Sequence, residues 1–164
     1  MIVYHEFEPY YDKKTEILIL GSTPSPKSRE QKFYYGHPKN RFWQVLASVF
    51  EDEVPLTTED KKNFLTKHHI ALWDVLASCD IKGASDSSIK NPLVNDISII
   101  LNKCQIKAIY TTGKKAYNLY QKYIFPKIKQ ETIYLPSTSP ANCRIKIEEL
   151  IKEYQILNNK GKKR

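Results

Sequence analysis

The chain has 164 residues, of which 41% are hydrophobic and 27% are charged, so it is long enough to bury a core of its own as one domain. No apolar run approaches the roughly 20 residues that cross a bilayer, and the N-terminus lacks the pattern of a secretory signal, so we expect a cytoplasmic protein with no membrane partner. Lysine and arginine number 26 against 18 acidic residues, and the resulting charge of +8 is equally compatible with a nucleic-acid partner and with a solvated basic surface.

The three cysteines, Cys79, Cys104 and Cys143, are widely scattered and form no CxxC pair. They are too few for the four ligands of a structural zinc or iron–sulfur site. We expect the first two to be small buried residues and the third to lie in a polar loop. We therefore expect no metal and no other cofactor.

Strands and helices are predicted to alternate along the chain. In order, the expected elements are a buried strand at 17–20, a helix at 40–50, a short helix at 59–67 capped by Thr58, a strand at 70–76, a loop at 81–90, a helix starting at Pro92, a strand at 106–112, a helix around 116–124, a strand at 132–135 and a final helix opened by Ser139 and Pro140. This alternation predicts an α/β protein, a three-layer α/β/α sandwich with a central four-stranded, mainly parallel sheet. We expect one domain over 1–157 and a basic, disordered tail over 158–164.

Two polar segments follow predicted strands, where parallel sheets bind ligands. The segment 33–43, FYYGHPKNRFW, comes after the first strand and its polar turn at 21–25, and the segment 135–144 follows the last strand. The first combines adjacent aromatic rings, an amide and a guanidinium. Such a set suits a pocket that holds a flat heterocycle beside a phosphate backbone. We expect both segments to form one site at the carboxyl edge of the sheet.

These features also have structural interpretations. Asn40 is a good N-cap for the helix that follows it, and Lys114 begins a helix where a simple cap and a phosphate site are equally compatible with the sequence. For His37 the favoured role is a structural hydrogen bond. The pair His68-His69 has no third metal ligand nearby, so we do not expect it to bind a metal. We expect Phe42, Trp43 and Trp73 to lie in the core. Asp74, Asp86, Ser87 and Ser88 have two open interpretations: they reach the site from the loop after the second strand, or they form a solvated turn, which is the favoured interpretation.

The segment 35–43, YGHPKNRFW, resembles the HPxNRFW signature of the uracil-DNA glycosylase superfamily in its mismatch-specific branch. The turn 21–25, GSTPS, occupies the position of that branch's first motif, and 135–144 matches its second motif, a loop that enters DNA. The segment 112–117 is similar to a GKxAY stretch between them. Because Thr23 stands where the branch has a catalytic asparagine, the chain looks more like the hypoxanthine-DNA glycosylase group, also called DNA-deoxyinosine glycosylases.

The resemblance implies a monomeric, monofunctional DNA glycosylase that starts base excision repair. It would flip a deaminated base out of DNA, hypoxanthine first and uracil second, and hydrolyse its N-glycosidic bond. It assigns catalysis to Asn40 and base binding to Ser22, Thr23, Pro24 and Tyr35. The implied DNA contacts are Ser25, Arg41, Lys114, Ser137, Thr138, Ser139, Pro140, Ala141, Asn142 and Arg144.

Two other functions stay open at this point. The chain is also compatible with a catalytically silent DNA-binding or damage-sensing module on the same fold, because Thr23 replaces the asparagine and the motifs supply no carboxylate. A small-molecule enzyme of nucleotide metabolism is the third class. The order of hypoxanthine, uracil, xanthine and mismatched thymine as substrates is not determined, since the base edge is read largely by backbone atoms.

Overall fold

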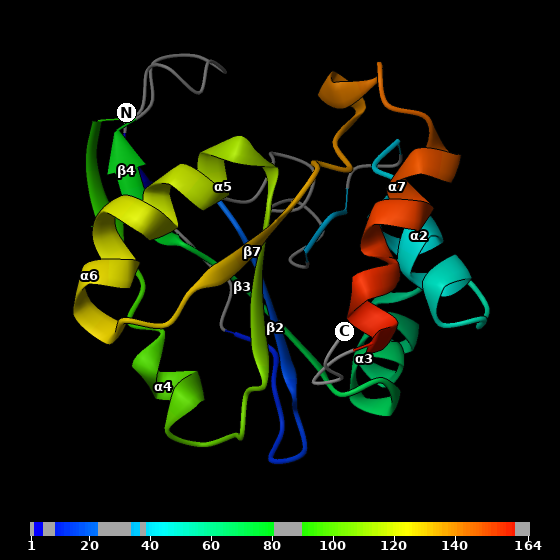
Figure 1. Ribbon diagram of the computed structural model, residues 1–164, viewed down its shortest axis with the longest axis horizontal. Helices are drawn as coiled ribbons and strands as arrows, with labels where there is room; N and C mark the ends of the chain where they lie inside the picture. Colours follow the sequence, from blue (N-terminus) through cyan, green and yellow to red (C-terminus); the bar gives the residue numbers. More distant parts are fainter. Residues whose placement is uncertain (1, 5–8, 23–33, 37–38, 81–89, 160–164) are drawn as a thin grey trace.

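The computed structural model describes residues 2–4, 9–22, 34–36, 39–80 and 90–159 (Figure 1). A four-stranded sheet runs through its centre, and all of its neighbouring strands are parallel. In spatial order its strands are β3 (Ile70–Asp74), β2 (Ile17–Gly21), β6 (Ala108–Thr112) and β7 (Thr132–Leu135). The predicted central parallel sheet is confirmed.

Strand β2 lies inside this sheet, between β3 and β6. All five of its residues are buried, as the continuous apolar run predicted for a strand covered on both faces. The parallel register aligns Ile17 with Ile70 and brings Gly21 beside Asp74. The carboxyl ends of these strands therefore lie side by side at one edge.

Helices cover both faces of the sheet, which gives the predicted three layers (Figure 1). One layer contains α5 (Gly113–Leu119), a π-helical turn (Tyr120–Ile124) and α6 (Phe125–Ile128), and the other contains α2 (Phe42–Val49), α3 (Thr58–Lys67) and α7 (Ile147–Tyr154). Helix α2 contributes six buried side chains to the core. Trp43 and Trp73 are both buried, as predicted.

The N-cap of α3 is Thr57 and not Thr58 as predicted. The Thr57 hydroxyl accepts a hydrogen bond from the backbone N–H of Asp60, and the Asp60 carboxylate accepts one from the backbone N–H of Thr57. This reciprocal capping box satisfies two N–H groups that a helix start leaves without a partner, so the helix begins at Thr58.

The region around 70–94 differs from the prediction. The expected strand 70–76 ends at Asp74, and a new strand, β4 (Leu76–Asp80), begins after Val75. It forms a small antiparallel sheet with β1 (Ile2–Tyr4) and β5 (Lys90–Val94).

The helix expected from Pro92 is wrong, because residues 90–94 pair with β4. The later helix α4 covers only Ser98–Leu101. Strand β5 lies at the edge of its sheet, and an edge strand tolerates a proline that lacks an N–H.

The chain after β7 also differs from the prediction. Ser139 accepts a hydrogen bond from the N–H of Ala141, but it caps only a 3-10 turn over Pro140–Asn142, and α7 begins at Ile147. The last described turn runs to Asn159, past the predicted domain end, and Asn158 Nδ2 donates to the carbonyl of Val49 at 3.1 Å. Residues 160–164 of the predicted tail lie outside the described residues.

Two of the cysteines lie where they were predicted. Cys104 is buried and Cys143 is exposed, while the side chain of Cys79 lies outside the described residues. Within the described ranges, no helix is both long and apolar enough to cross a membrane.

Candidate active site

Two segments far apart in the chain meet at the carboxyl edge of the central sheet, toward the top of Figure 1. One leads into α2 and carries Tyr35 and Asn40; the other, 136–145, follows β7. They are joined directly, since the backbone N–H of Arg41 donates to the carbonyl of Thr138 at 3.2 Å. The prediction that both polar segments lie at one edge is therefore confirmed by their contact.

The side-chain amide of Asn40 is held by two donors. Its Oδ1 accepts from the backbone N–H of Phe42 at 2.9 Å and from the hydroxyl of Thr138 at 2.7 Å. Both oxygen lone pairs are thus engaged, and the amide has one orientation. In the part of the chain that the structure describes, no group accepts a hydrogen bond from Asn40 Nδ2. Asn40 therefore caps α2 and at the same time presents N–H donors.

Thr138, for which a DNA contact is predicted, lies inside the site. Its side chain is only 2% exposed and faces Asn40 rather than the outer surface. The hydrogen bond to the half-buried Asn40 explains this orientation, because a buried hydroxyl needs a partner.

The guanidinium of Arg41 is occupied by the loop at 136–145. Nη1 donates to the carbonyl of Ile145 at 2.6 Å, and Nη2 lies 3.1 Å from the carbonyl of Asn142 and 3.5 Å from that of Ser139. A planar cation is well suited to hold several carbonyls at once. In this structure Arg41, for which a DNA contact is predicted, fixes the shape of the loop.

Hydrogen bonds within the loop add to this fixation. Asn142 Nδ2 donates to the carbonyl of Ser137 at 2.9 Å, and the N–H of Ser139 donates to Ser137 Oγ at 3.1 Å. Ala141, Cys143 and Arg144 are exposed, and Ser137, Ser139, Pro140 and Asn142 are half-buried. The predicted DNA-binding loop is a defined turn with an outward-facing tip.

Tyr35 lies between α2 and the sheet edge. Its ring stacks on that of Phe42, with centroids 3.7 Å apart and an interplanar angle of 11°, and its hydroxyl is 3.1 Å from Thr112 Oγ1. Burial raises the pKa of the Tyr35 hydroxyl, and the negative charge of Asp74 raises it further. Its φ of 54° is in the left-handed region, where a tyrosine is strained. The phenol is thus a neutral, fixed ring beside the strand ends.

Asp74 is a further residue at this edge of the sheet, and its role was left open by the sequence. It is 4% exposed at the end of β3, so the predicted solvated turn is wrong for this residue. A Cβ added to Gly21 would lie 2.5 Å from Asp74 Oδ1 and 3.5 Å from Tyr35 Oη. The available signal was an apolar strand, 70–73, that ends in a carboxylate where the neighbouring strand ends in glycine.

The remaining predicted residues are only partly described. Ser22 is half-buried, and its carbonyl accepts a hydrogen bond from the N–H of Leu76 at 3.1 Å. Lys114 is exposed at the start of α5, next to Gly113, which has a φ of +88° and packs near Ser137. Thr23, Pro24, Ser25, His37, Pro38, Asp86, Ser87 and Ser88 lie outside the described residues.

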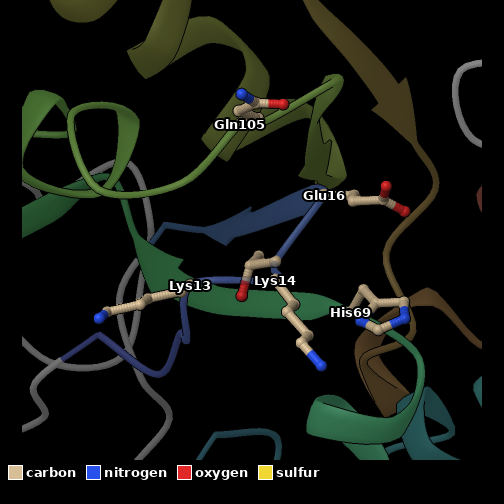
Figure 2. A pocket seen from close by; sticks show the side chains of 6 residues that line it. Lys13, Lys14, Glu16, His69 and Gln105 are labelled. Atoms are coloured by element: carbon tan, nitrogen blue, oxygen red, sulfur yellow. The ribbon is translucent and has the colours of Figure 1, made fainter.

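A separate pocket lies at the opposite edge of the sheet. It is lined by residues that precede β2 and β3, among them Lys14, Glu16 and His69, as Figure 2 shows. Because Lys13 and Lys14 are exposed and Glu16 pairs with Lys107, this pocket offers a solvated surface of mixed charge. It is distinct from the edge where Asn40, Tyr35 and Asp74 gather.

The arrangement of these motifs is matched by known proteins. Residues 8–155 fit the family model described as the uracil DNA glycosylase superfamily. The chain belongs to this superfamily. It is 37% identical over 140 residues to a protein from Methanosarcina barkeri named hypoxanthine DNA glycosylase, and 36% identical to one of the same name from Methanosarcina acetivorans. Each alignment covers 84% of this chain and 87% of the relative.

A solved structure of this superfamily has the same fold. It is the solution NMR structure of a provisionally named uracil DNA glycosylase from Methanosarcina acetivorans. The TM-score is 0.80 at 32% identity, and the match covers 96% of this chain and 99% of the other. The α/β sandwich described above is therefore the fold of this solved structure as well.

Proposed function

We propose that this superfamily member is a monofunctional DNA glycosylase that releases hypoxanthine from DNA, with uracil as its second substrate, and so starts base excision repair. It acts in the cytoplasm as a monomer and without a metal or other cofactor. The observation that carries the proposal is the fixed amide of Asn40, which is linked through Phe42 to a stacked tyrosine at the sheet edge. Relatives at 36–37% identity that are named hypoxanthine DNA glycosylase support the choice of base.

The proposed reaction is hydrolysis of the bond between the base and C1′ of the sugar. As this bond breaks, its electron pair leaves with the base and the sugar becomes an oxocarbenium-like cation. Water then bonds to C1′ through its oxygen, and one of its protons is lost to solvent while the released base takes up a proton. Because the cation is already electrophilic, the water needs to be positioned more than it needs to be deprotonated.

Asn40 performs this positioning in the proposed mechanism. Since its Oδ1 is engaged by Phe42 and Thr138, the amide cannot serve as a proton acceptor, and its function lies with Nδ2. Nδ2–H donates to the oxygen of the water, whose other lone pair faces C1′. A donor fixed before the substrate arrives does not have to reorient during the reaction.

Tyr35 forms one wall of the proposed base pocket. Phe42 covers one face of its ring, and the extruded base stacks on the other. Stacking of this kind contributes roughly 1–3 kcal/mol per base. The backbone of Ser22 reads the base edge together with Thr23 and Pro24.

The loop after β7 approaches the DNA strand in the proposed complex. Its half-buried and exposed residues, Ser137, Ser139, Pro140, Ala141, Asn142 and Arg144, contact the backbone and the vacated stack. Lys114 and Ser25 contact phosphate. Arg41 and Thr138 take part indirectly, because they hold the loop against α2.

A panel of duplexes tests this proposal. Each duplex carries one hypoxanthine, uracil, xanthine or mismatched thymine at the same position, with an undamaged duplex as the control. We expect release of hypoxanthine to be fastest, followed by uracil, with cleavage of the strand only after alkali treatment. Tight binding of lesions without release of any base would instead favour the damage-sensing module, and activity confined to free nucleosides would favour an enzyme of nucleotide metabolism.

A further inference from the structure

We propose that the acidic connection between α2 and α3, residues 51–60, is a docking surface for a protein partner that presents a lysine or arginine next to an apolar side chain. Helix α2 begins beside Asn40 and spans eight residues, so the connection after its other end lies roughly 12 Å along the helix axis from the candidate active site (Figure 1). The inference goes beyond the proposed function and does not depend on it.

The acidic connection concentrates negative charge in a chain whose net charge is +8. Its acidic residues are Glu51, Asp52, Glu53, Glu59 and Asp60. Asp52 is paired with His68 and Lys67, and Asp60 takes part in the cap of α3. The other three carboxylates bond to no group in the part of the chain that the structure describes. The connection therefore attracts basic groups.

The stability of α2 does not account for the carboxylates that follow it. The C-terminal end of a helix carries partial negative charge, so Glu51 and Glu53 are placed where the helix dipole disfavours them. Glu51 also has a φ of 53°, a conformation that favours glycine or asparagine just after a helix. Departures from local preference are expected at functional sites, which supports a binding role for this segment.

Two apolar side chains of the same segment face outward. Leu56 is 82% exposed and Val54 is 42% exposed. Leu56 precedes the N-cap Thr57, a position from which an apolar residue often packs against the fourth residue of the helix. That residue is Lys61 here, and Leu56 stays exposed. Apolar side chains framed by charged ones are the usual composition of a protein–protein interface.

A pocket of about 280 Å³ opens beside these side chains. Its lining combines apolar and charged side chains, namely Val54, Pro55, Phe64, Asp52, Glu53, Asp60, Asn63 and Lys67. The ammonium of Lys67 is neutralised by Asp52 at 3.1 Å, whereas Glu53 has no side-chain partner among the described residues. A lysine or arginine has an apolar stem and a cationic head. Its stem would line the apolar wall while its head reaches Glu53.

Charge complementarity selects a protein segment as the occupant. DNA and anionic membranes carry the same sign of charge as the acidic connection, so both are repelled by it. No group of three or more His, Cys, Asp and Glu side chains within the described ranges is arranged to hold a metal ion. A protein segment supplies the cation for Glu53 and, in a neighbouring residue, the apolar group for Val54 and Leu56.

A fluorescent peptide built of lysine and leucine residues tests the inference on the full chain in the absence of DNA. Its Kd is measured by fluorescence anisotropy, together with two matched peptides. In one of them serine replaces each leucine, and in the other glutamate replaces each lysine. We expect the lysine–leucine peptide to bind, the serine peptide to bind at least about 5-fold more weakly, and the glutamate peptide not to bind.

Two variants locate the binding site on the protein. Glu53→Gln removes the unpaired carboxylate of the pocket, and Leu56→Ser removes the most exposed apolar side chain. Because both side chains are exposed, we expect both variants to fold, with each weakening peptide binding by at least about 5-fold. Glu153→Gln on α7 and Ile99→Ser on α4 remove exposed groups of the same kinds elsewhere and should change the Kd by less than about 2-fold.

Weaker binding by both variants, with unchanged binding by both controls, supports the inference. Failure of the parent to bind the lysine–leucine peptide overturns it, and so does equal binding by the parent and both variants. Binding that appears only after residues 160–164 are removed would assign the surface to the chain's own basic residues instead. A parent dimer that Leu56→Ser dissociates in sedimentation would assign it to a second copy, which also overturns the inference.

Discussion

The hydroxyl of Thr138 donates a hydrogen bond of 2.7 Å to Oδ1 of Asn40 and joins the proposed catalytic residue to the loop that is proposed to meet DNA. The two residues are 98 positions apart in the chain. Because Phe42 N–H occupies the other lone pair, this contact sets which end of the amide faces outward. The position of the loop therefore determines the orientation of the Asn40 amide.

Replacing Thr138 by valine should impair catalysis more than binding. Valine has a similar shape but no hydroxyl, so the amide of Asn40 loses one of its two donors and can turn. We expect kcat to fall by about 10-fold or more, with a small change in the Kd for the lesion duplex. A misplaced catalytic group slows the reaction strongly even when binding is intact. Thr138→Ser keeps the donor and should restore most of kcat. Equal loss of kcat in the serine and valine variants would contradict this role.

Arg41→Ala distinguishes a loop-holding arginine from a phosphate contact. The Arg41 guanidinium donates hydrogen bonds to the carbonyls of Ser139, Asn142 and Ile145. We therefore expect the variant to expose the loop to limited proteolysis and to weaken DNA binding. The slope of log Kd against log salt should stay unchanged. Arg144→Ala, which removes an exposed cation, should lower that slope by about 0.9, as for one lost phosphate contact. A similar drop for Arg41→Ala would show that Arg41 contacts phosphate.

Gly21→Ala should destabilise the protein through Asp74. The added Cβ would lie 2.5 Å from Asp74 Oδ1, and we expect a loss of about 1–3 kcal/mol in the free energy of unfolding, typical of overpacking. In the double variant with Asp74→Ser the clashing carboxylate is gone. Denaturant unfolding should therefore give a smaller loss for Gly21→Ala in the Asp74→Ser background than in the parent. Strictly additive losses would mean that the strand end relaxes without involving Asp74.

Local patterns explain why the central sheet could be predicted from sequence. The apolar run at 17–20 had only one stable location, a strand buried on both faces, and the polar segments after β2 and β7 had to leave at the same edge. Phe42 and Trp43 follow helical spacing and lie in the core as expected. These features depend on neighbours in sequence.

Features that depend on tertiary pairing were not predictable in this way. The residues from Pro92 onward carry a helix-like pattern, yet residues 90–94 form β5 because β4 offers a partner. The roles of Arg41 and Thr138 depend on contacts about 100 positions away in the chain, which no local motif encodes. Asp74 looked like part of a polar turn, and only the register beside Gly21 shows that it is a buried group of the site.

Asp52 should make the stability of the fold depend on pH in the acid range. Its pKa is lowered from 3.8 to about 2, mainly by the hydrogen bond with His68 and then by the N–H of Glu53 and by Lys67. A carboxyl with a lowered pKa in the folded state contributes stability above its unfolded pKa and loses it as the pH falls through the folded value. The contribution should therefore be present above about pH 4 and disappear toward pH 2.

Denaturant unfolding of the parent and of Asp52→Asn as a function of pH measures this contribution. We expect the difference in unfolding free energy between the two proteins to shrink as the pH falls from 4 to 2. Asp96→Asn removes an exposed carboxylate elsewhere and serves as the comparison. A difference between parent and Asp52→Asn that stays constant over this range would show that the hydrogen bond to His68 does not depend on the charge of Asp52.

Asn40 is proposed to act in catalysis through its Nδ2 donor and not only as the cap of α2. Asn40→Asp separates the two roles, because aspartate is also a good N-cap, with oxygens that accept from Phe42 and Thr138, but it has no N–H to present. Asn40→Ala removes both roles and should also reduce the free energy of unfolding by about 1 kcal/mol.

The most direct test is single-turnover release of hypoxanthine from a duplex by the parent, Asn40→Asp and Asn40→Ala, with the free energy of unfolding of each protein measured alongside. We predict that both variants release the base at least about 100-fold more slowly than the parent, while Asn40→Asp keeps the parent's stability. If Asn40→Asp released hypoxanthine at the parent's rate, or if activity fell only in step with stability, Asn40 would be a structural cap, which would contradict its catalytic role.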